Sequence, residues 1–177
     1  YNSNFGGYIT FDGTNDKATL SSGWTSFGTD PFTIEFWFRP HTAAVDEAIL
    51  SISNQNSGVG SFQVAFDSSS KIRMVNSDPN VIQTSNITFS ANTWQQVVLV
   101  REGTGTGEFK FYKDGSLNST ATNNVNLNSP EQLQLGTNRP ATKFLDADLS
   151  ILRIYKGKGL TAAEVEQNYN ALKGRYA

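Results

Sequence analysis

The side chains of this chain that could do chemistry are its carboxylates, and their spacing does not form a catalytic pair. Glu35 lies in an alternating segment beside Trp37, with no second acid on the same face. Asp146 and Asp148 stand at i and i+2, but Leu149-Ser150-Ile151 follows them rather than a third acid. A retaining glycosidase needs two carboxylates about 5 to 5.5 Å apart, one as nucleophile and one as general acid. We therefore expect that the protein is not an enzyme.

Other reactive residues are scarce. The chain has no cysteine, which excludes disulfides, thiolate zinc sites and cysteine nucleophiles. Its one histidine, His41, excludes sites made of several histidines and follows Pro40 in an expected loop, so we interpret it as a surface residue. No Gly-x-Ser-x-Gly motif marks a nucleophilic serine.

Length and charge exclude further classes of protein. The chain has 177 residues, and 14 Lys and Arg against 16 Asp and Glu give a formal net charge of −2. This balance does not favour binding to nucleic acid, and no stretch reaches the roughly 20 apolar residues of a membrane span. We expect a single domain over residues 1–177. Because the chain lacks an initial methionine, we expect a processed product or part of a larger protein.

The middle of the chain alternates apolar and polar residues, as a strand with two different faces does. One face of the segment from Pro31 to Pro40 carries Phe32, Ile34, Phe36 and Phe38, and the other carries Thr33, Glu35, Trp37 and Arg39. Similar runs lie at 48–53, 61–67, 71–75, 95–101, 108–113, 132–135 and 149–155. Clusters of Gly, Asn, Asp or Ser bound them, so the chain predicts an all-β fold, an antiparallel two-sheet sandwich.

Two local signals are more specific. Asp114-Gly115 tolerates the positive φ angles of a two-residue turn and predicts a β-hairpin. Near the C-terminus, Thr161 and Glu164 have the spacing of a capping box, and apolar residues then recur at helical spacing. We predict one short helix over about 161–172 that packs on the sandwich.

Five segments, taken in order, resemble one family. They are Tyr8-Ile9-Thr10-Phe11-Asp12-Gly13-Thr14-Asn15-Asp16, Phe32-Thr33-Ile34-Glu35-Phe36-Trp37-Phe38-Arg39-Pro40, Asn92-Thr93-Trp94 with the strand to Arg101, Phe111-Tyr112-Lys113-Asp114-Gly115, and Leu149 to Tyr155 with the helix after it. This series resembles the laminin-G-like branch of the concanavalin A-like lectin/glucanase domains. The resemblance implies a jelly roll that covers almost the whole chain.

The closing segment, 154–176, is similar to versions of this domain carried on bacteriophage structural proteins, particularly those of marine phages. That likeness implies a virion structural protein, located on the virion surface or outside cells. Its partners would be neighbouring subunits of the assembly, with a homo-oligomer among the expected forms.

The family resemblance also implies a structural calcium ion. Members of the family often bind calcium with a carboxylate near the first strand and a second acid near the last strand, and Ca²⁺ prefers several oxygen ligands. Asp12 and Asp16 match the first half of this pattern, and Asp148 is the candidate for the second, although Ser150 and Ile151 replace the usual acid. The alternative for Asp12 is an Asx turn that supports Gly13.

A glycan-binding surface would need an aromatic platform beside amide and hydroxyl groups. Trp24 lies in a loop-like stretch, and Asn54 and Asn56 lie in a polar loop of the kind that carries binding residues at sandwich ends. We take these three as ligand-binding candidates, with an ordinary polar loop as the alternative. Trp37 and Trp94 lie on expected strands and are predicted to be core or near-core residues.

Three functions remain open. The first is a non-catalytic structural or interaction module on the outside of a larger assembly, namely a capsid decoration or tail protein of a phage. The second is a glycan-binding module for attachment to a host or surface. The third is a polysaccharide hydrolase, which lacks its carboxylate pair.

Overall fold

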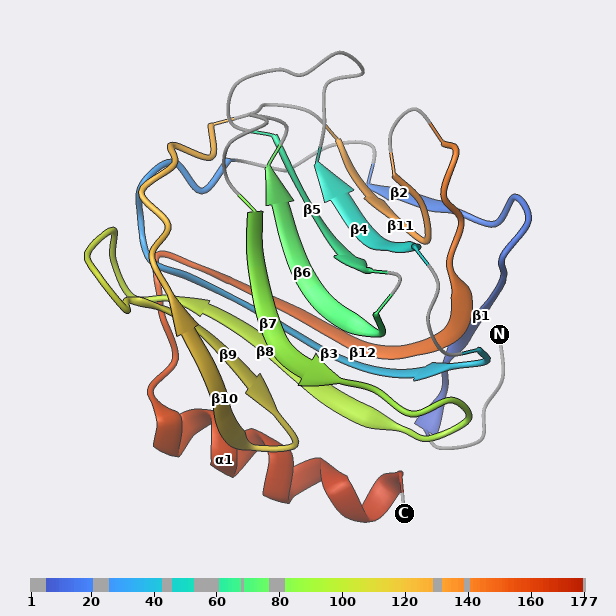
Figure 1. Ribbon diagram of the computed structural model, residues 1–177. Coiled ribbons are helices and arrows are strands. Elements are labelled where there is room, and N and C mark those ends of the chain that lie inside the picture. Colours follow the sequence, from blue (N-terminus) through green and yellow to red (C-terminus); the bar gives the residue numbers. More distant parts are fainter. Residues whose placement is uncertain are drawn as a thin grey trace.

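Two antiparallel sheets form the body of the protein in this computed structural model (Figure 1). The structure describes residues 6–20, 26–42, 46–52, 61–67, 69–76, 82–128, 132–138 and 141–176. Sheet I contains β1 (Ile9–Asp12), β3 (Phe32–Pro40), β8 (Gln95–Arg101), β9 (Phe109–Lys113), β10 (Ser116–Ala121) and β12 (Asp146–Lys156). Sheet II contains β2 (Ala18–Leu20), β4 (Ala48–Ile52), β5 (Phe62–Phe66), β6 (Lys71–Asn76), β7 (Ile82–Thr88) and β11 (Leu133–Leu135).

The spatial order is β1-β12-β3-β8-β9-β10 in sheet I and β2-β11-β4-β5-β6-β7 in sheet II. Every named pairing is antiparallel. The prediction of an all-β antiparallel sandwich is therefore confirmed.

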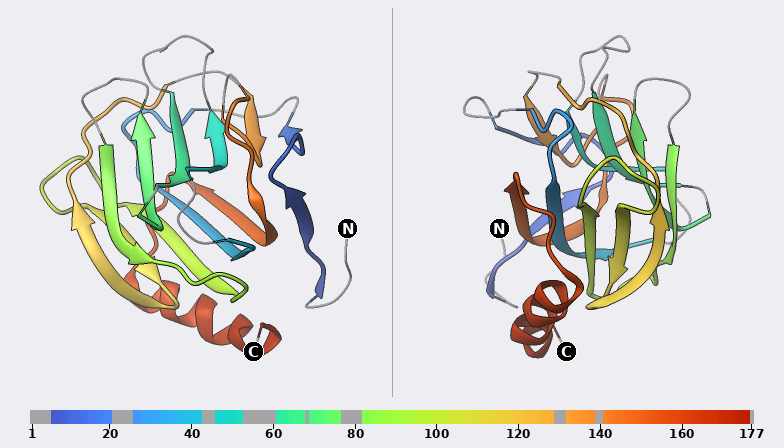
Figure 2. Two further views of the ribbon diagram at one scale, coloured as in Figure 1. Left: turned by 45° about the vertical axis from the view of Figure 1, so that its right-hand side comes forward. Right: turned by 90° about the vertical axis from the view of Figure 1, so that its left-hand side faces the viewer.

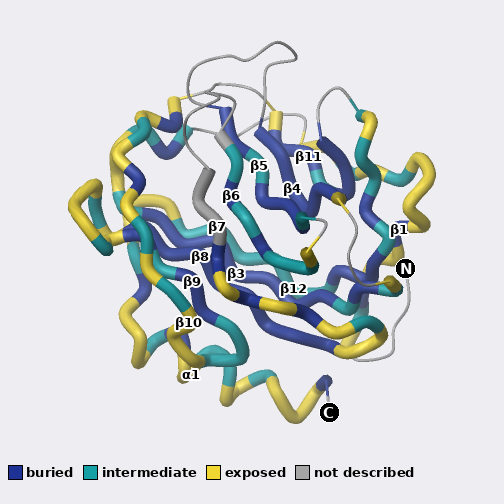
Figure 3. The backbone as a smooth tube through the Cα atoms, in the orientation of Figure 1, coloured by how far each residue is buried: buried dark blue, intermediate teal, exposed yellow. Residues whose placement is uncertain are grey.

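The main core lies between the two sheets and is rich in phenylalanine. The predicted apolar face of β3 points into it, and Phe32, Ile34, Phe36 and Phe38 are all buried there. Phe32 stacks on Phe27 with a centroid distance of 4.1 Å, and Phe38 lies 5.1 Å from Phe66 of sheet II. Figure 3 shows this buried layer as a continuous dark band through β3 and β8. Burial of these rings supplies the main hydrophobic stabilisation of the sandwich.

A helix covers the outer face of sheet I (Figure 2). It is α1 (Ala162–Leu172), followed by the 3₁₀ turn η2 (Lys173–Arg175). The predicted capping box is present, because the Glu164 amide donates to Thr161 Oγ1 and the Thr161 amide donates to a Glu164 carboxylate oxygen. Val165 packs against the outward side chains of Val98, Val100 and Tyr112. None of the helices within the described ranges has the length and apolar character of a membrane span.

The predicted hairpin joins β9 to β10. Asp114 and Gly115 have φ angles of 49° and 79°, as a two-residue turn of type I′ requires. A Cβ added to Gly115 would lie 2.9 Å from the Tyr169 ring of α1. Glycine at this position therefore permits both the turn and the close approach of the helix.

The last strand is longer than its predicted extent of 149–155 and contains an irregularity. Its pairing with β3 shifts register between Leu149 and Leu152. Such a bulge re-aims the side chains on either side of it. Asp146 and Asp148 lie before the bulge, paired with β1, where they point to the outer face of sheet I.

Arg101 is buried at the end of β8 and anchors two loop segments. Its guanidinium donates to the backbone carbonyls of Gly28, Asp30 and Val125, and it lies 4.8 Å from the centroid of the Phe32 ring. Burial lowers the pKa of Arg101 to about 10, and the negative charge of Asp30 offsets part of this decrease. The charge is thus held inside the fold by backbone oxygens.

Candidate functional site

The outward side chains of β3 form a row along the outer face of sheet I. Thr33 bonds the segment just before α1, Glu35 lies under α1, Trp37 lies near its C-terminal end, and Arg39 lies beyond it. The row divides the outer face into a buried polar group at Glu35, an aromatic group at Trp37 and a charged network at Arg39.

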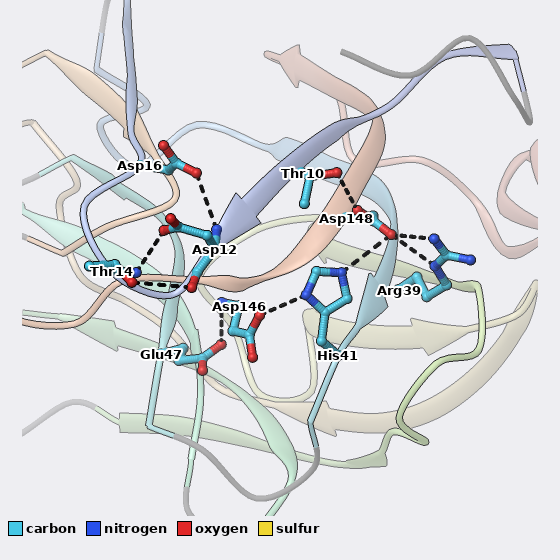
Figure 4. A network of polar contacts seen from close by, with 9 residues as sticks. All are labelled: Thr10, Asp12, Thr14, Asp16, Arg39, His41, Glu47, Asp146 and Asp148. Carbon is cyan, nitrogen blue, oxygen red and sulfur yellow. Dashed lines mark hydrogen bonds and ion pairs between the residues drawn. The ribbon is translucent and has the colours of Figure 1, made fainter.

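The charged network centres on Asp148 of β12 (Figure 4). Arg39 donates from Nε and Nη2 to Asp148 Oδ2, at 2.8 and 2.5 Å. Thr10 of β1 donates its hydroxyl to Asp148 Oδ1 at 2.7 Å. Charge-assisted pairs of this kind are among the stronger hydrogen bonds in proteins. The network ties three adjacent strands together, since β12 lies between β1 and β3.

His41 belongs to the same network, so our interpretation of it as a plain surface residue is incomplete. Its Nδ1 lies 2.6 Å from Asp146 Oδ1, and its Nε2 lies 3.4 Å from Asp148 Oδ2. Glu47 accepts the backbone N–H of Asp146 at 2.8 Å. Burial raises the pKa of Glu47, and this hydrogen bond partly offsets the rise. Within the described ranges no serine or threonine hydroxyl bonds His41, so the network does not form a hydrolytic triad.

The structure brings together two of the three residues predicted to bind calcium. The Asp12 amide donates to Asp16 Oδ2, and Asp12 Oδ1 accepts the Thr14 amide in the Asx turn that was the alternative. Asp148 does not fit a cation site, because the Arg39 guanidinium opposes a second positive charge. No group of three potential metal-binding side chains occurs among the described residues. Calcium binding stays a prediction, which calorimetry with CaCl₂ on the wild type and an Asp12→Ala variant would test.

Glu35 is buried beneath α1 rather than open to a substrate. It accepts hydrogen bonds from Gln96 Nε2 and Asn168 Nδ2, both at 2.9 Å, and pairs with Arg153 at 3.3 Å. Asn168 comes from the helix and Arg153 from β12, so the carboxylate joins the helix to the sheet. Its geometry indicates a structural role.

An open pocket of about 410 Å³ lies where the end of α1 meets the sheet. We call it the aromatic pocket, and it is lined by Trp37, Trp94, Asp114, Tyr169, Lys173, Gly174 and Tyr176. Its volume is within the roughly 300 to 1,000 Å³ of small-molecule sites in proteins. The lining combines large amphipathic rings with one acid and one base.

Trp37 is the centre of the ring cluster beside this pocket. Its ring stacks on Tyr176 at a centroid distance of 4.3 Å and lies parallel to Tyr169 at 5.7 Å. Only 2% of Trp37 is exposed, and its buried Nε1–H reaches no acceptor in the described structure. Arg39 borders this cluster, with its guanidinium carbon 5.4 Å from the centroid of the Trp94 ring.

The ligand-binding residues predicted from sequence, Trp24, Asn54 and Asn56, lie outside the described residues. The prediction that Trp37 and Trp94 are core or near-core is confirmed by their burial, although they lie under the helix rather than between the sheets. Sequence reasoning missed the aromatic pocket. The available signal was the outward position of Trp37 together with Tyr169 in the apolar stripe of the helix.

Comparisons with known proteins agree with this architecture. The model of the concanavalin A-like lectin/glucanases superfamily matches residues 12–166. No curated protein matches the chain.

Solved structures with similar folds come from several kinds of protein. A heptameric SAP-like pentraxin from Limulus polyphemus has a TM-score of 0.66 and 17% identity, over 90% of this chain and 79% of the pentraxin. The receptor-binding domain of botulinum neurotoxin D has a TM-score of 0.71 and 16% identity, over 96% of this chain and 45% of that chain. A Trypanosoma rangeli sialidase in complex with the inhibitor DANA has a TM-score of 0.65 and 14% identity, over 92% of this chain and 27% of the sialidase chain.

This chain therefore spans less than half of the toxin domain and about a quarter of the sialidase chain. At these identities the likeness concerns the fold. The family match covers most of the chain. The chain belongs to the concanavalin A-like lectin/glucanases superfamily.

Proposed function

We propose that this domain acts by contact rather than catalysis, as an interaction module on the outside of a larger assembly. The resemblance of residues 154–176 to phage structural proteins supports a virion as that assembly, with the domain on its surface. The observation that carries the contact role is an apolar groove at one edge of the sandwich.

This groove lies beside β2, the edge strand of sheet II, and has a volume of about 320 Å³. Its lining consists of Ala18, Thr19, Leu20, Leu133, Leu135 and Leu152. Leu20 is 47% exposed, and Ile9 on β1, the neighbouring edge strand of sheet I, is 44% exposed. Exposed apolar side chains on an edge strand favour pairing with another chain.

The opposite side of the sandwich is closed by contacts between the sheets. There the Asn86 amide of β7 lies 3.4 Å from Ser119 Oγ of β10, and Lys113 donates to the Thr88 carbonyl at 2.8 Å. The groove therefore marks one side of the molecule as the side for association.

A second copy of this chain is the partner that the groove fits. Antiparallel pairing of β2 with β2 of another copy would extend sheet II. The interface would be self-complementary, so each copy's exposed Leu20 would cover the groove of the other. A structurally similar pentraxin is heptameric, which supports oligomer formation as a use of this fold.

Analytical ultracentrifugation over a range of protein concentrations tests this proposal. The wild type should self-associate, and Leu20→Lys should shift it to monomer because a charge would enter the apolar interface. Leu117→Lys is the matched control, since Leu117 is 53% exposed on β10 at the closed side. A wild type that is monomeric at every concentration, or equal loss of association in both variants, would contradict the proposal.

A second candidate function is attachment to glycans, and the aromatic pocket favours it. Rings with an apolar body and a polar edge suit ligands that have both kinds of surface. The test is a glycan array probed with the purified domain, with Trp24→Ala included because Trp24 was predicted as a contact. The absence of signal from every glycan would reject this candidate.

A further inference from the structure

We propose that the aromatic pocket binds the ring of a neutral hexopyranose. This inference rests on the glycan-attachment candidate and goes beyond it by naming the site and the class of sugar. The pocket lies on the outer face of sheet I at the end of α1.

The first argument is the match between the pocket lining and a pyranose ring. A pyranose presents an apolar C–H face and a rim of hydroxyls. The pocket is lined by the edges of the buried rings of Trp37, Trp94 and Tyr176 and by the partly exposed ring of Tyr169, beside polar groups. Of these rings, Tyr169 is the more exposed and is held in place, because it packs on Gly115 of the hairpin turn. A ring held in this way loses little side-chain entropy on binding.

The second argument is the unused donor of Trp37. Its indole N–H is buried and lacks an acceptor in the described part of the chain, although Trp37 lines the pocket. Buried donors without partners are uncommon in folded proteins and cost stability. A sugar hydroxyl is an acceptor that could satisfy this donor once the covering Tyr176 ring shifts.

The third argument is the charge of the pocket. Asp114 and Lys173 contribute one negative and one positive charge to the lining, so their charges cancel. Asp114 Oδ1 accepts a hydrogen bond from the backbone N–H of Gln96 at 2.9 Å, which fixes the carboxylate at the turn. Lys173 Nζ lies 5.7 Å from the centroid of the Tyr169 ring. The ammonium disfavours a quaternary amine over the rings, and the carboxylate disfavours an acidic sugar, which leaves a neutral ring as the fitting ligand.

Gly174 provides a way to close the pocket without disturbing the fold. It lines the pocket, its backbone lies outside the left-handed region, and a Cβ added there meets nothing within 4 Å. Phenylalanine at this position therefore has room and should occupy the pocket. Gln167→Phe is the matched control, because Gln167 is exposed on α1 and does not line the pocket.

The experiment is calorimetric titration of the whole chain with methyl β-glucopyranoside and methyl β-galactopyranoside, and with choline and methyl sialoside as charged probes. At least one neutral pyranoside should bind, and Gly174→Phe should weaken its binding more than tenfold because the ring space is filled. Trp37→Phe and Asp114→Asn should each weaken binding about tenfold or less, since the first removes the indole donor and the second replaces a charged acceptor with a neutral amide. Gln167→Phe should bind as the wild type does, and circular dichroism should show that all four variants fold.

The outcomes separate this inference from the function on which it rests. If the glycan array is positive but the Gly174→Phe and Trp37→Phe variants bind as tightly as the wild type, the pocket is not the site and glycan attachment stands. If choline or methyl sialoside binds in preference to both pyranosides, the class of ligand is wrong. A negative array rejects glycan attachment itself and, with it, this inference.

Discussion

From Phe32 to Phe38 both faces of β3 are buried, but they are stabilised by different interactions. On the core side, Phe32 and Phe36 pack among other apolar side chains between the sheets. On the helix side, Thr33 and Glu35 are also fully buried, yet each makes hydrogen bonds to particular partners. Thr33 Oγ1 accepts the Leu160 amide at 2.9 Å and donates to the Lys158 carbonyl at 3.0 Å.

A strand face can thus be buried in two ways, by apolar packing or by directed hydrogen bonds. The core face depends on volume and apolar area, which many side-chain combinations can supply. The helix face depends on directed hydrogen bonds, which only particular side chains in particular positions can form. The core face should therefore determine how stable the sandwich is, and the helix face should determine where α1 lies on it.

The largest expected effect is on the core face. Phe36→Ala should lower the free energy of unfolding by about 3 to 5 kcal/mol, because it removes a buried ring and leaves a cavity. Denaturant unfolding followed by circular dichroism measures this change. A loss below about 1 kcal/mol would show that this face is not core.

A smaller effect is expected at Glu35 on the helix face. Glu35→Ala should cost about 2 to 3 kcal/mol, since it removes the acceptor of the buried Gln96 side-chain amide and breaks the hydrogen bond from Asn168. Glu35→Gln should cost less, because an amide oxygen can still accept hydrogen bonds. The same unfolding experiment compares both variants. Equal stability of Glu35→Ala and the wild type would show that these hydrogen bonds do not hold the helix.

The helix cap should contribute less again. Thr161→Ala removes the side chain that caps α1 and should cost about 1 kcal/mol. Thermal unfolding would measure the loss, with Thr106→Ala as a control at an exposed loop position. If the two variants lose equal stability, the capping box has no special role.

The smallest effect concerns the charged network beyond the helix. Burial raises the pKa of Glu47 above its ordinary value of 4.5, so the folded protein favours its protonated form. The stabilisation linked to this proton is present below pH 4.5 and is lost as the pH rises through the raised folded pKa. Glu47→Gln does not titrate, so its unfolding free energy relative to wild type should increase from acidic to neutral pH. Parallel pH profiles would contradict this expectation.

Sequence patterns predicted the inner strands well and the edge strands poorly. Strand β8 has its predicted bounds and β3 begins one residue after the predicted Pro31, because central strands carry long runs of apolar or alternating residues. Strands β2, β7 and β10 were not among the predicted runs, and all three lie at sheet edges. Edge strands bury less side-chain area, so their sequences carry a weaker periodic signal. β10, for example, has Leu117 as its one large apolar residue.

The site was harder to predict than the fold because its residues meet only in three dimensions. Alternation placed Trp37 opposite the Phe residues of β3, but it could not show that Tyr176 would stack on Trp37. Asp148 was a reasonable metal candidate from its position near the last strand. Its pairing with Arg39 depends on the register between β12 and β3, which a single sequence does not specify.

The way in which Arg101 is held has a consequence for how this domain tolerates mutation. The guanidinium binds carbonyl oxygens of the main chain at positions 28, 30 and 125, and every amino acid supplies such an oxygen. A substitution at position 30 or 125 therefore keeps these bonds so long as the path of the main chain is kept. At position 28, where φ is +61°, glycine keeps that path without strain. The loops of this end of the sandwich can thus diversify around a fixed internal anchor.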